Sequence, residues 1–204
     1  MLERLAQLDA AWFHWINTGQ RNPLFDALMP FVTGAVNWSI PILVSWTALL
    51  LFGGRRGRTA ALLVVPLIVL SDQTSSHLLK HTFERVRPCA ALPDVHLLVG
   101  CSSSSSMPSS HAANFGAAAF HLSMFYPGAA PWLLGLALLI GYSRVYVGVH
   151  YPLDTVVGFG VGLTAALVIR GLYRFGSRRA ESREVGSRFV RWIRPRRAGT
   201  TDPR

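Results

Sequence analysis

The chain has 204 residues, of which half are hydrophobic and 15% are charged, whereas about a quarter of the residues in an average soluble domain are charged. This length fits one domain, and the apolar residues come in long blocks, so the composition favours a multi-pass membrane protein over a soluble one. The net charge of +10 does not indicate nucleic-acid binding, because the arginines lie mainly beside apolar segments, where basic residues mark cytoplasmic loops.

The first 34 residues predict an amphipathic helix in the membrane interface. Its apolar residues recur at helical spacing, with charged and polar residues between them: Leu2, Leu5, Leu8, Trp12, Phe13 and Ile16. Residues 24–32 are compatible with a second such helix or with part of a sixth span, although Asp26 and Pro30 disfavour a clean span.

Five apolar segments follow, and most of them approach the roughly 20 residues that a helix needs to cross a bilayer. They cover residues 35–52, 59–79, 110–126, 131–149 and 151–172. The third segment is short and contains Asn114, His121 and Ser123, so we expect neighbouring helices to shield it from lipid.

The sequence therefore predicts an all-α, polytopic membrane helix bundle with five to six transmembrane helices and an N-terminal amphipathic helix. Residues 1–34 form the interfacial segment, residues 35–176 the membrane domain and residues 177–204 a basic cytoplasmic tail. The basic loop Arg55–Arg58 is also expected in the cytoplasm. With five spans, the three polar clusters described next all fall on the outer face of the membrane.

Three cations lie near the outer ends of the predicted spans. Lys80, the only lysine of the chain, ends the second segment, Arg87 follows in the next loop, and Arg144 lies near the outer end of the fourth segment. Arginine donates in a planar, bidentate geometry to phosphate oxygens, and lysine supplies a compact charge. Any one of these residues alone is also compatible with a cation that snorkels to the interface.

The second cluster is Pro108-Ser109-Ser110-His111, directly before the third segment. The N–H groups at a helix N-terminus favour an anion, and Ser109 or Ser110 could cap the helix and donate to an oxyanion. Plain capping is the alternative use of these serines. His111 has a side chain whose pKa near neutrality suits a general acid.

The third cluster pairs a histidine with a carboxylate. Pro152 favours the first turn of the fifth helix, so His150 is expected just before that helix and Asp154 in its opening turn. Asp154 can then hold one ring nitrogen of His150 while the other attacks phosphorus, although a purely structural pair is the alternative. Asp72 shares a helical face with Lys80, and its role stays open between a site carboxylate and a structural hydrogen-bonding residue.

The cysteines and the metal-binding residue types give two further expectations. Cys89 and Cys101 lie in the same outer loop, where they form either a disulfide or two free thiols. No metal-ligand spacing is present, so we expect no cofactor and expect the cations to neutralise charge instead.

In this order the three clusters resemble the motifs of the type 2 phosphatidic acid phosphatase family of integral membrane lipid phosphatases. The first is Lys80, six residues, then Arg87-Pro88; the second is Pro108–His111, with Ser110 where the family has glycine; the third is Ser143-Arg144 with His150 and Asp154. The resemblance implies that His150 is a nucleophile that forms a phosphohistidine, that Asp154 orients it, and that His111 protonates the leaving group. It also implies that Lys80, Arg87, Ser109, Ser110 and Arg144 bind the phosphoryl oxygens.

Within the family, the chain is most similar to the small bacterial undecaprenyl pyrophosphate phosphatases. This implies a metal-independent hydrolase of the bacterial inner membrane whose substrate is a phosphorylated membrane lipid and whose site faces the periplasm or the cell exterior. Phosphatidylglycerophosphate, phosphatidic acid and lipid A phosphates are alternative substrates, and a non-catalytic lipid-phosphate binding or transport protein is an alternative of another class. The motifs do not indicate an oligomeric state.

Overall fold

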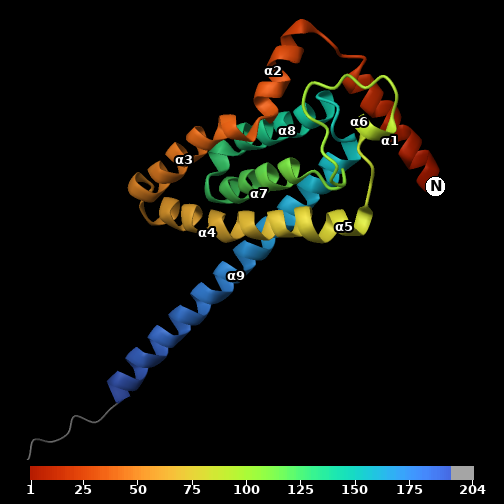
Figure 1. Ribbon diagram of the computed structural model, residues 1–204. Coiled ribbons are helices and arrows are strands. Elements are labelled where there is room, and N and C mark those ends of the chain that lie inside the picture. The colour runs from red at the N-terminus through yellow and green to blue at the C-terminus, as the bar shows by residue number, and fades with distance from the viewer. Residues whose placement is uncertain (194–204) are drawn as a thin grey trace, which may run out of the picture. The chain divides into compact units, whose positions relative to one another are not determined.

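The computed structural model describes the backbone of residues 1–193 and the side chains of residues 1–179 except Leu2. Within this part of the chain all regular structure is helical, which confirms the predicted all-α class (Figure 1). The elements are α1 (Leu2–Asn17), α2 (Pro23–Thr33), α3 (Ala35–Phe52), α4 (Gly54–Asp72), η1 (Gln73–Leu79), α5 (Lys80–Phe83), α6 (Pro88–Ala91), α7 (Ser110–Phe125), η2 (Pro127–Ala129), α8 (Ala130–Tyr146) and α9 (Pro152–Ile193). Residues 194–204 of the predicted basic tail lie outside the described residues.

Among the described residues, four helical stretches are long and apolar enough to cross a membrane, so the chain is a multi-pass membrane protein. They run over Ala35–Phe52, Gly54–Ala91, Pro127–Tyr146 and Pro152–Arg179. The third predicted segment, α7, has only 16 residues and packs between α4 and α8, as its polar residues led us to expect (Figure 1). Its His121 is buried and bonded to the backbone oxygen of Ala60 at 3.0 Å.

The apolar residues of the N-terminal helix α1 are divided between an exposed side and a buried side. Leu5, Leu8 and Trp12 are half exposed, whereas Asp9, Phe13 and Asn17, spaced four residues apart, are buried. Residues at this spacing share one helix face. The face that docks on the protein therefore carries a carboxylate and an amide, and the apolar face points away from the bundle, as suits an interfacial helix.

The second span changes its winding before it reaches the first cluster. The α-helix α4 ends at Asp72, and the seven residues of η1 form a π-helix before Lys80 opens α5. Such π-helical turns are rare and frequently occur at functional sites. Glu84 then ends the helix in a left-handed conformation, with φ of 45°, and releases the chain into the loop that carries Arg85 and Arg87.

Two glycines of α9 allow the backbone of α7 to approach closely. A Cβ atom added to Gly158 would lie 2.6 Å from the backbone oxygen of Ser109, and one added to Gly162 would lie 2.5 Å from that of Ala113. Small residues at this spacing permit tight helix packing within a membrane. The contact places the start of α7 against the first turns of α9, and so brings the second cluster next to the third.

We expect Gly162→Ala to destabilise the protein by about 1–3 kcal/mol, because its methyl group would meet backbone atoms that cannot move independently. Thermal unfolding of the detergent-purified variant measures this. Gly160→Ala is the matched control, since a Cβ atom there meets nothing within 4 Å. Equal melting temperatures for the two variants would contradict the packing argument.

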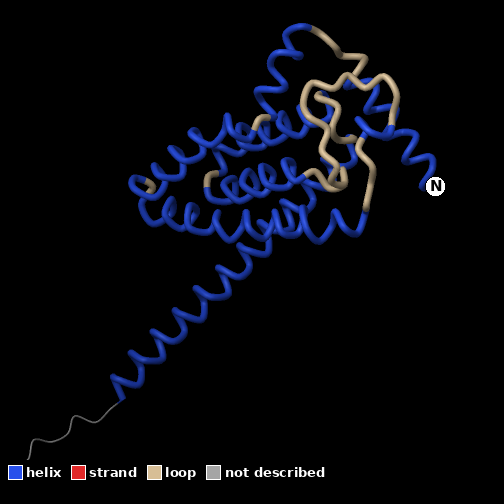
Figure 2. The backbone as a smooth tube through the Cα atoms, in the orientation of Figure 1, coloured by secondary structure: helices blue, strands red, loops and turns tan. Residues whose placement is uncertain are grey.

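The loops that carry the predicted site residues gather at one end of the bundle (Figure 2). At the other end the α3–α4 turn meets the end of α7, where the Arg56 guanidinium lies 4.9 Å from the ring centre of Tyr126. The basic Arg55–Arg58 turn and the polar clusters thus lie at opposite ends of the helices.

Candidate functional site

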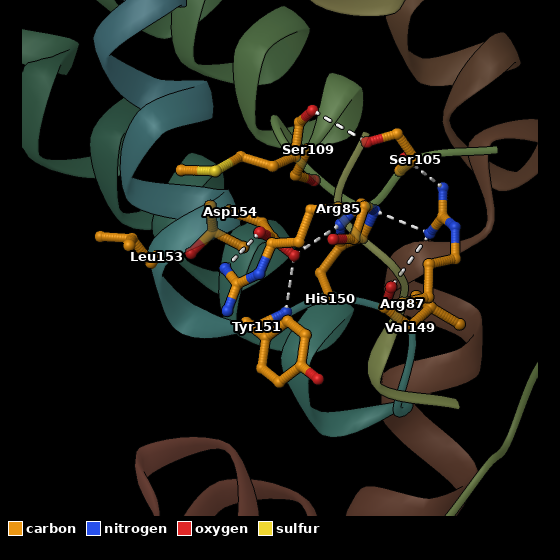
Figure 3. A network of polar contacts seen from close by, with 12 residues as sticks. Arg85, Arg87, Ser105, Ser109, Val149, His150, Tyr151, Leu153 and Asp154 are labelled. Carbon is orange, nitrogen blue, oxygen red and sulfur yellow. Dashed lines mark hydrogen bonds and ion pairs between the residues drawn. The ribbon is translucent and has the colours of Figure 1, made fainter. Parts of the chain in front are cut away.

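Arg87 holds the centre of the site and is itself almost fully buried. Its Nε donates to the backbone oxygen of Ser104 at 2.8 Å. Its Nη1 donates to the backbone oxygen of Val149 at 3.0 Å (Figure 3). Nη1 also lies 3.2 Å from Nε2 of His150. One guanidinium therefore joins the serine-rich loop to the segment before α9, which lie far apart in the sequence.

The contacts of His150 define which ring nitrogen carries the proton. Because an arginine only donates, Nε2 of His150 accepts from Arg87, and the neutral ring carries its proton on Nδ1. Nδ1 faces Oδ2 of Asp154 at 3.5 Å, which is too long for a full hydrogen bond. The lone pair of Nε2 thus points at a cation, and the Nδ1 proton points at a carboxylate.

Asp154 is completely buried, and each of its oxygens has its own donor. Oδ2 accepts from the backbone N–H of Tyr151 at 2.8 Å, and Oδ1 accepts from Nη1 of Arg85 at 2.8 Å (Figure 3). Backbone and arginine donors stabilise the ionised form of a carboxylate. Asp154 therefore presents a fixed negative charge to the histidine ring.

Burial lowers the pKa of His150 to about 4, and the positive charges of Arg144 and Arg87 act in the same direction, while Asp154 opposes them. The imidazole is consequently neutral at pH 7, and its Nε2 lone pair, which accepts from Arg87 in this structure, does not carry a proton. Because this folded-state pKa is below the unfolded value of about 6.5, the stability contributed by neutral His150 is complete above pH 6.5 and is lost as the pH falls toward 4.

We expect kcat/KM for phosphate release to fall as the pH drops below about 4, because protonation of His150 in the free enzyme occupies the lone pair that attacks phosphorus. A pH profile with two different phosphorylated lipids measures this and separates titration of the enzyme from titration of the lipid phosphate. A midpoint at pH 6.5 with both lipids would contradict a buried, neutral His150.

The Pro108–His111 cluster meets the third cluster through the backbone. Ser109 caps α7, and its N–H donates to the backbone oxygen of Asp154 at 3.0 Å. The Ser110 hydroxyl lies 2.8 Å from that of Ser76 in η1, and Ser76 donates to Asp72 at 3.2 Å. The hydroxyls of Ser109 and Ser110 thus both have protein partners in this structure.

Asp72 belongs to this structural network. Its Oδ1 accepts from Ser76 and from the side-chain amide of Asn114, which donates at 3.0 Å. The carboxylate thus links η1 to α7 and indirectly holds Ser110. These contacts favour the hydrogen-bonding role that the sequence left open.

The remaining cations surround the same point. Arg144 donates to the Thr33 hydroxyl at 2.7 Å, and its buried Nε has no partner among the described residues. Lys80, Arg87 and Arg144 all interact electrostatically with His111. The structure thus brings together every charged residue and both histidines of the three clusters.

A cavity of about 450 Å³ opens beside Lys80 and Arg87. Its lining includes Lys80, Arg85, Arg87 and the serines 102–105. The volume accommodates a phosphorylated head group, and the lining supplies positive charge and hydroxyl donors. The run of serines at residues 102–105 therefore forms one wall of the cavity.

The sequence analysis missed two residues of the site, Arg85 and Asp9. Arg85 lies inside the first motif, but its neighbours Lys80 and Arg87 already accounted for the basic character of that segment. Asp9 looked like one of the polar residues of an interfacial helix. Only its spacing of four residues from Phe13 and eight from Asn17 could have indicated a buried face.

Cys89 and Cys101 are joined by a disulfide that closes the loop between Arg87 and the serine run. We expect the double variant Cys89→Ser, Cys101→Ser to lose about 3 kcal/mol of stability, since the bridge restricts the unfolded chain. Thermal unfolding with and without reductant measures this: reductant should lower the melting temperature of the unmodified protein but not that of the double variant. An unchanged melting temperature in both cases would contradict the expectation.

Comparison with known proteins matches the site region to one family. The model of the PAP2 superfamily matches residues 61–177, which include all three clusters. Phosphatidylglycerophosphatase B of Bacillus subtilis is 31% identical over 164 residues, which cover 74% of this chain and 76% of that protein. Undecaprenyl-diphosphatase BcrC of the same organism is 30% identical over 156 residues, which cover 74% of this chain and 75% of that protein.

A solved structure shows the same fold. The crystal structure of Aquifex aeolicus LpxE superimposes with a TM-score of 0.63 at 28% sequence identity, covering 80% of this chain and 95% of that chain.

Proposed function

The chain belongs to the PAP2 superfamily, and on that premise we propose that it hydrolyses undecaprenyl pyrophosphate to undecaprenyl phosphate through a phosphohistidine at His150. As a member of this superfamily it is a hydrolase acting on phosphoric esters or anhydrides of membrane lipids. The observation that carries the proposed mechanism is the arrangement of His150, whose Nε2 faces Arg87 while Nδ1 faces Asp154.

In the first step the terminal phosphoryl group binds among Lys80, Arg87 and Arg144. The lone pair of His150 Nε2 attacks phosphorus, a P–N bond forms, and the bond from phosphorus to the leaving oxygen breaks. His111 gives that oxygen a proton, and the ring of His150 becomes cationic, with its Nδ1 proton directed at Asp154. Bound phosphate offsets the surrounding positive charge, so substrate binding favours the protonated form of His111 that this step needs.

In the second step His111 accepts a proton from water, and the resulting nucleophile attacks phosphorus. The P–N bond breaks, inorganic phosphate leaves, and His150 is again neutral. The cations hold the phosphoryl oxygens in both steps, which is the electrostatic role that metal ions perform in other phosphoryl-transfer enzymes.

Ser109 and Ser110 contribute chiefly by placing the N-terminus of α7 toward the phosphate. Their hydroxyls already contact Ala112 N–H and Ser76, respectively, so the helix dipole is the better-supported source of stabilisation. Ser110 stands where the family motif has glycine. Its hydroxyl contacts Ser76, which a glycine could not do.

The outward orientation of the site is part of this proposal. The basic Arg55–Arg58 turn lies at the end of the helices away from the site, as the positive-inside rule requires for an outer-facing site. The Cys89–Cys101 disulfide supports the same orientation, because disulfides persist in oxidising compartments. In a bacterium this orientation places the site at the periplasmic or external face of the inner membrane.

The test is phosphate release by the detergent-purified protein, with EDTA present, from a panel of lipids. We expect undecaprenyl pyrophosphate to give the highest kcat/KM, and phosphatidylglycerophosphate, phosphatidic acid and lipid A to give lower values. Preference for one of the other three lipids would replace the proposed substrate, and activity that disappears with EDTA and returns with a divalent metal would overturn the metal-independent mechanism.

A further inference from the structure

The buried face of the N-terminal helix α1 reaches the catalytic carboxylate through one arginine. Nη1 of Arg85 donates to Asp154 at 2.8 Å, and its Nη2 donates to Asp9 in α1 at 2.7 Å. The Arg85 guanidinium also stacks 3.9 Å above the ring of Tyr151. One planar side chain thus bridges two carboxylates that are both almost completely buried.

Asp9 makes a second contact with the same region. Its Oδ1 accepts from the backbone N–H of Leu153 at 2.8 Å, so a residue of α1 caps the first turn of α9. Phe13, one turn further along α1, packs against Tyr151 with ring centres 5.6 Å apart. Helix α1 therefore contacts Tyr151 and Leu153, which both lie between His150 and Asp154.

The arrangement has a direct effect on how Asp154 is presented. With Oδ1 held by Arg85, the carboxylate cannot rotate to offer that oxygen to His150, and Oδ2 is left facing Nδ1. A lysine could not span both carboxylates, because only a guanidinium carries two parallel donor groups in a fixed plane. Arg85 also forms an ion pair with Asp9, so its positive charge acts less strongly on Asp154. Asp154 therefore remains a partner for His150.

We propose that Asp9 and Arg85 are positioning residues for the nucleophile: α1 orients Asp154 through Arg85 and thereby fixes the ring of His150. The inference rests on the proposed function for its kinetic consequence, but its structural consequence can be measured without any substrate. The proposed mechanism assigns the reacting phosphoryl group to Lys80, Arg87 and Arg144, whereas Arg85, although it lines the same cavity, acts through Asp154. The contribution of Asp9 and Arg85 is to kcat and not to lipid binding.

We expect Arg85→Gln to lower kcat by about 10- to 100-fold with little change in KM, the range known for comparable carboxylate partners of functional histidines. Asp9→Asn should lower kcat less, because Arg85 keeps one carboxylate. In the double variant, Asp9→Asn should add nothing to the loss from Arg85→Gln, since the coupling passes through the arginine. Additive losses, or a tenfold rise of KM with unchanged kcat, would overturn the proposal.

Asp26→Asn is the matched control. Asp26 also ties an N-terminal helix to the loops, by accepting from His96 and Tyr146, but it does not contact Asp154. The Asp26→Asn variant should have a lower melting temperature, but its kcat should fall less than that of Asp9→Asn. Kinetic losses of equal size in Asp26→Asn and Asp9→Asn would show that α1 acts only through general stability.

The substrate-free measurement is the titration of His150 by NMR of the protein labelled at histidine, assigned by comparison with His150→Gln. The charged groups around His150 are Arg87, Arg144 and Asp154, with Lys80 and His111 nearby. Removing Arg85 frees Asp154 to stabilise the protonated ring, so the midpoint should rise by roughly one pH unit in Arg85→Gln and stay unchanged in Asp26→Asn.

The two measurements separate the hypotheses. An unchanged midpoint in Arg85→Gln would overturn the positioning role even if the protein is an active phosphatase. A raised midpoint would support the positioning role even if undecaprenyl pyrophosphate and the other lipids were not hydrolysed, in which case the proposed substrate and mechanism would fail alone.

Discussion

We expect His150→Ala to reduce phosphate release by about 10⁴-fold or more, while the affinity for the lipid changes little. In the proposed mechanism His150 makes the P–N bond, so its removal closes the covalent route, whereas the cations proposed to bind the phosphate remain. Phosphate release by the purified variant measures the loss, and binding of the radiolabelled lipid to the same preparation measures the affinity.

His150→Gln is the companion variant, because it keeps more of the buried volume and separates loss of chemistry from loss of folding. A brief reaction with labelled substrate followed by quenching in alkali should trap acid-labile phosphate on the unmodified protein and none on either variant. Turnover that survives in both variants would falsify the assignment of His150.

The second large effect is expected from Arg87→Lys, which should lower kcat/KM by roughly 10²- to 10³-fold, as loss of an aligned donor to a transition-state oxygen does. Lysine keeps the charge but cannot place donors on the phosphoryl group, on Ser104 and on Val149 at once. The buried backbone oxygen of Val149 would lose its donor, at a cost of about 1–3 kcal/mol in stability. Steady-state kinetics and thermal unfolding of the same preparation measure both losses.

Arg58→Lys is the matched control for this experiment. Arg58 is also an arginine beside a span, and it donates to the backbone oxygen of Leu50 at the opposite end of the helices. Its substitution should leave kcat/KM within about twofold, as is usual for surface substitutions away from a site. Equal losses of kcat/KM in the two variants would mean that replacing any arginine by lysine weakens the enzyme, and that the geometry at Arg87 is not the cause.

The parts of the fold that follow from local pattern were predictable from the sequence. The first apolar segment, residues 35–52, has the same bounds as α3, because lipid-facing helices need only a long apolar stretch. The third segment, residues 110–126, differs from α7 by one residue, since Ser109 caps the helix as its residue type suggested. The motif spacing likewise indicated which charged residues lie together in the site, because residues a few positions apart at a helix end have fixed relative positions.

Features that depend on distant contacts were not predictable from the sequence. The π-helix η1 has no periodicity signal of its own, and the second apolar segment looked like one continuous helix. The ion pair between Arg85 and Asp9 joins residues 76 positions apart, and both residue types are common at membrane interfaces. Similarly, the hydroxyl of Ser110 was expected on the phosphate, whereas the structure shows it against Ser76, whose position depends on η1.

The π-helical turn also determines where the second span tolerates a change of length. Deleting one residue from an α-helix rotates everything beyond the deletion by about 100° and shortens it by about 1.5 Å. In α4 such a deletion would carry Lys80 to another side of the helix and away from Arg87. Within Gln73–Leu79 the same deletion can instead convert π-helical bonding to α-helical bonding and leave both flanks in register. A scan of single-codon deletions along residues 59–83 should therefore find its permissive positions inside η1.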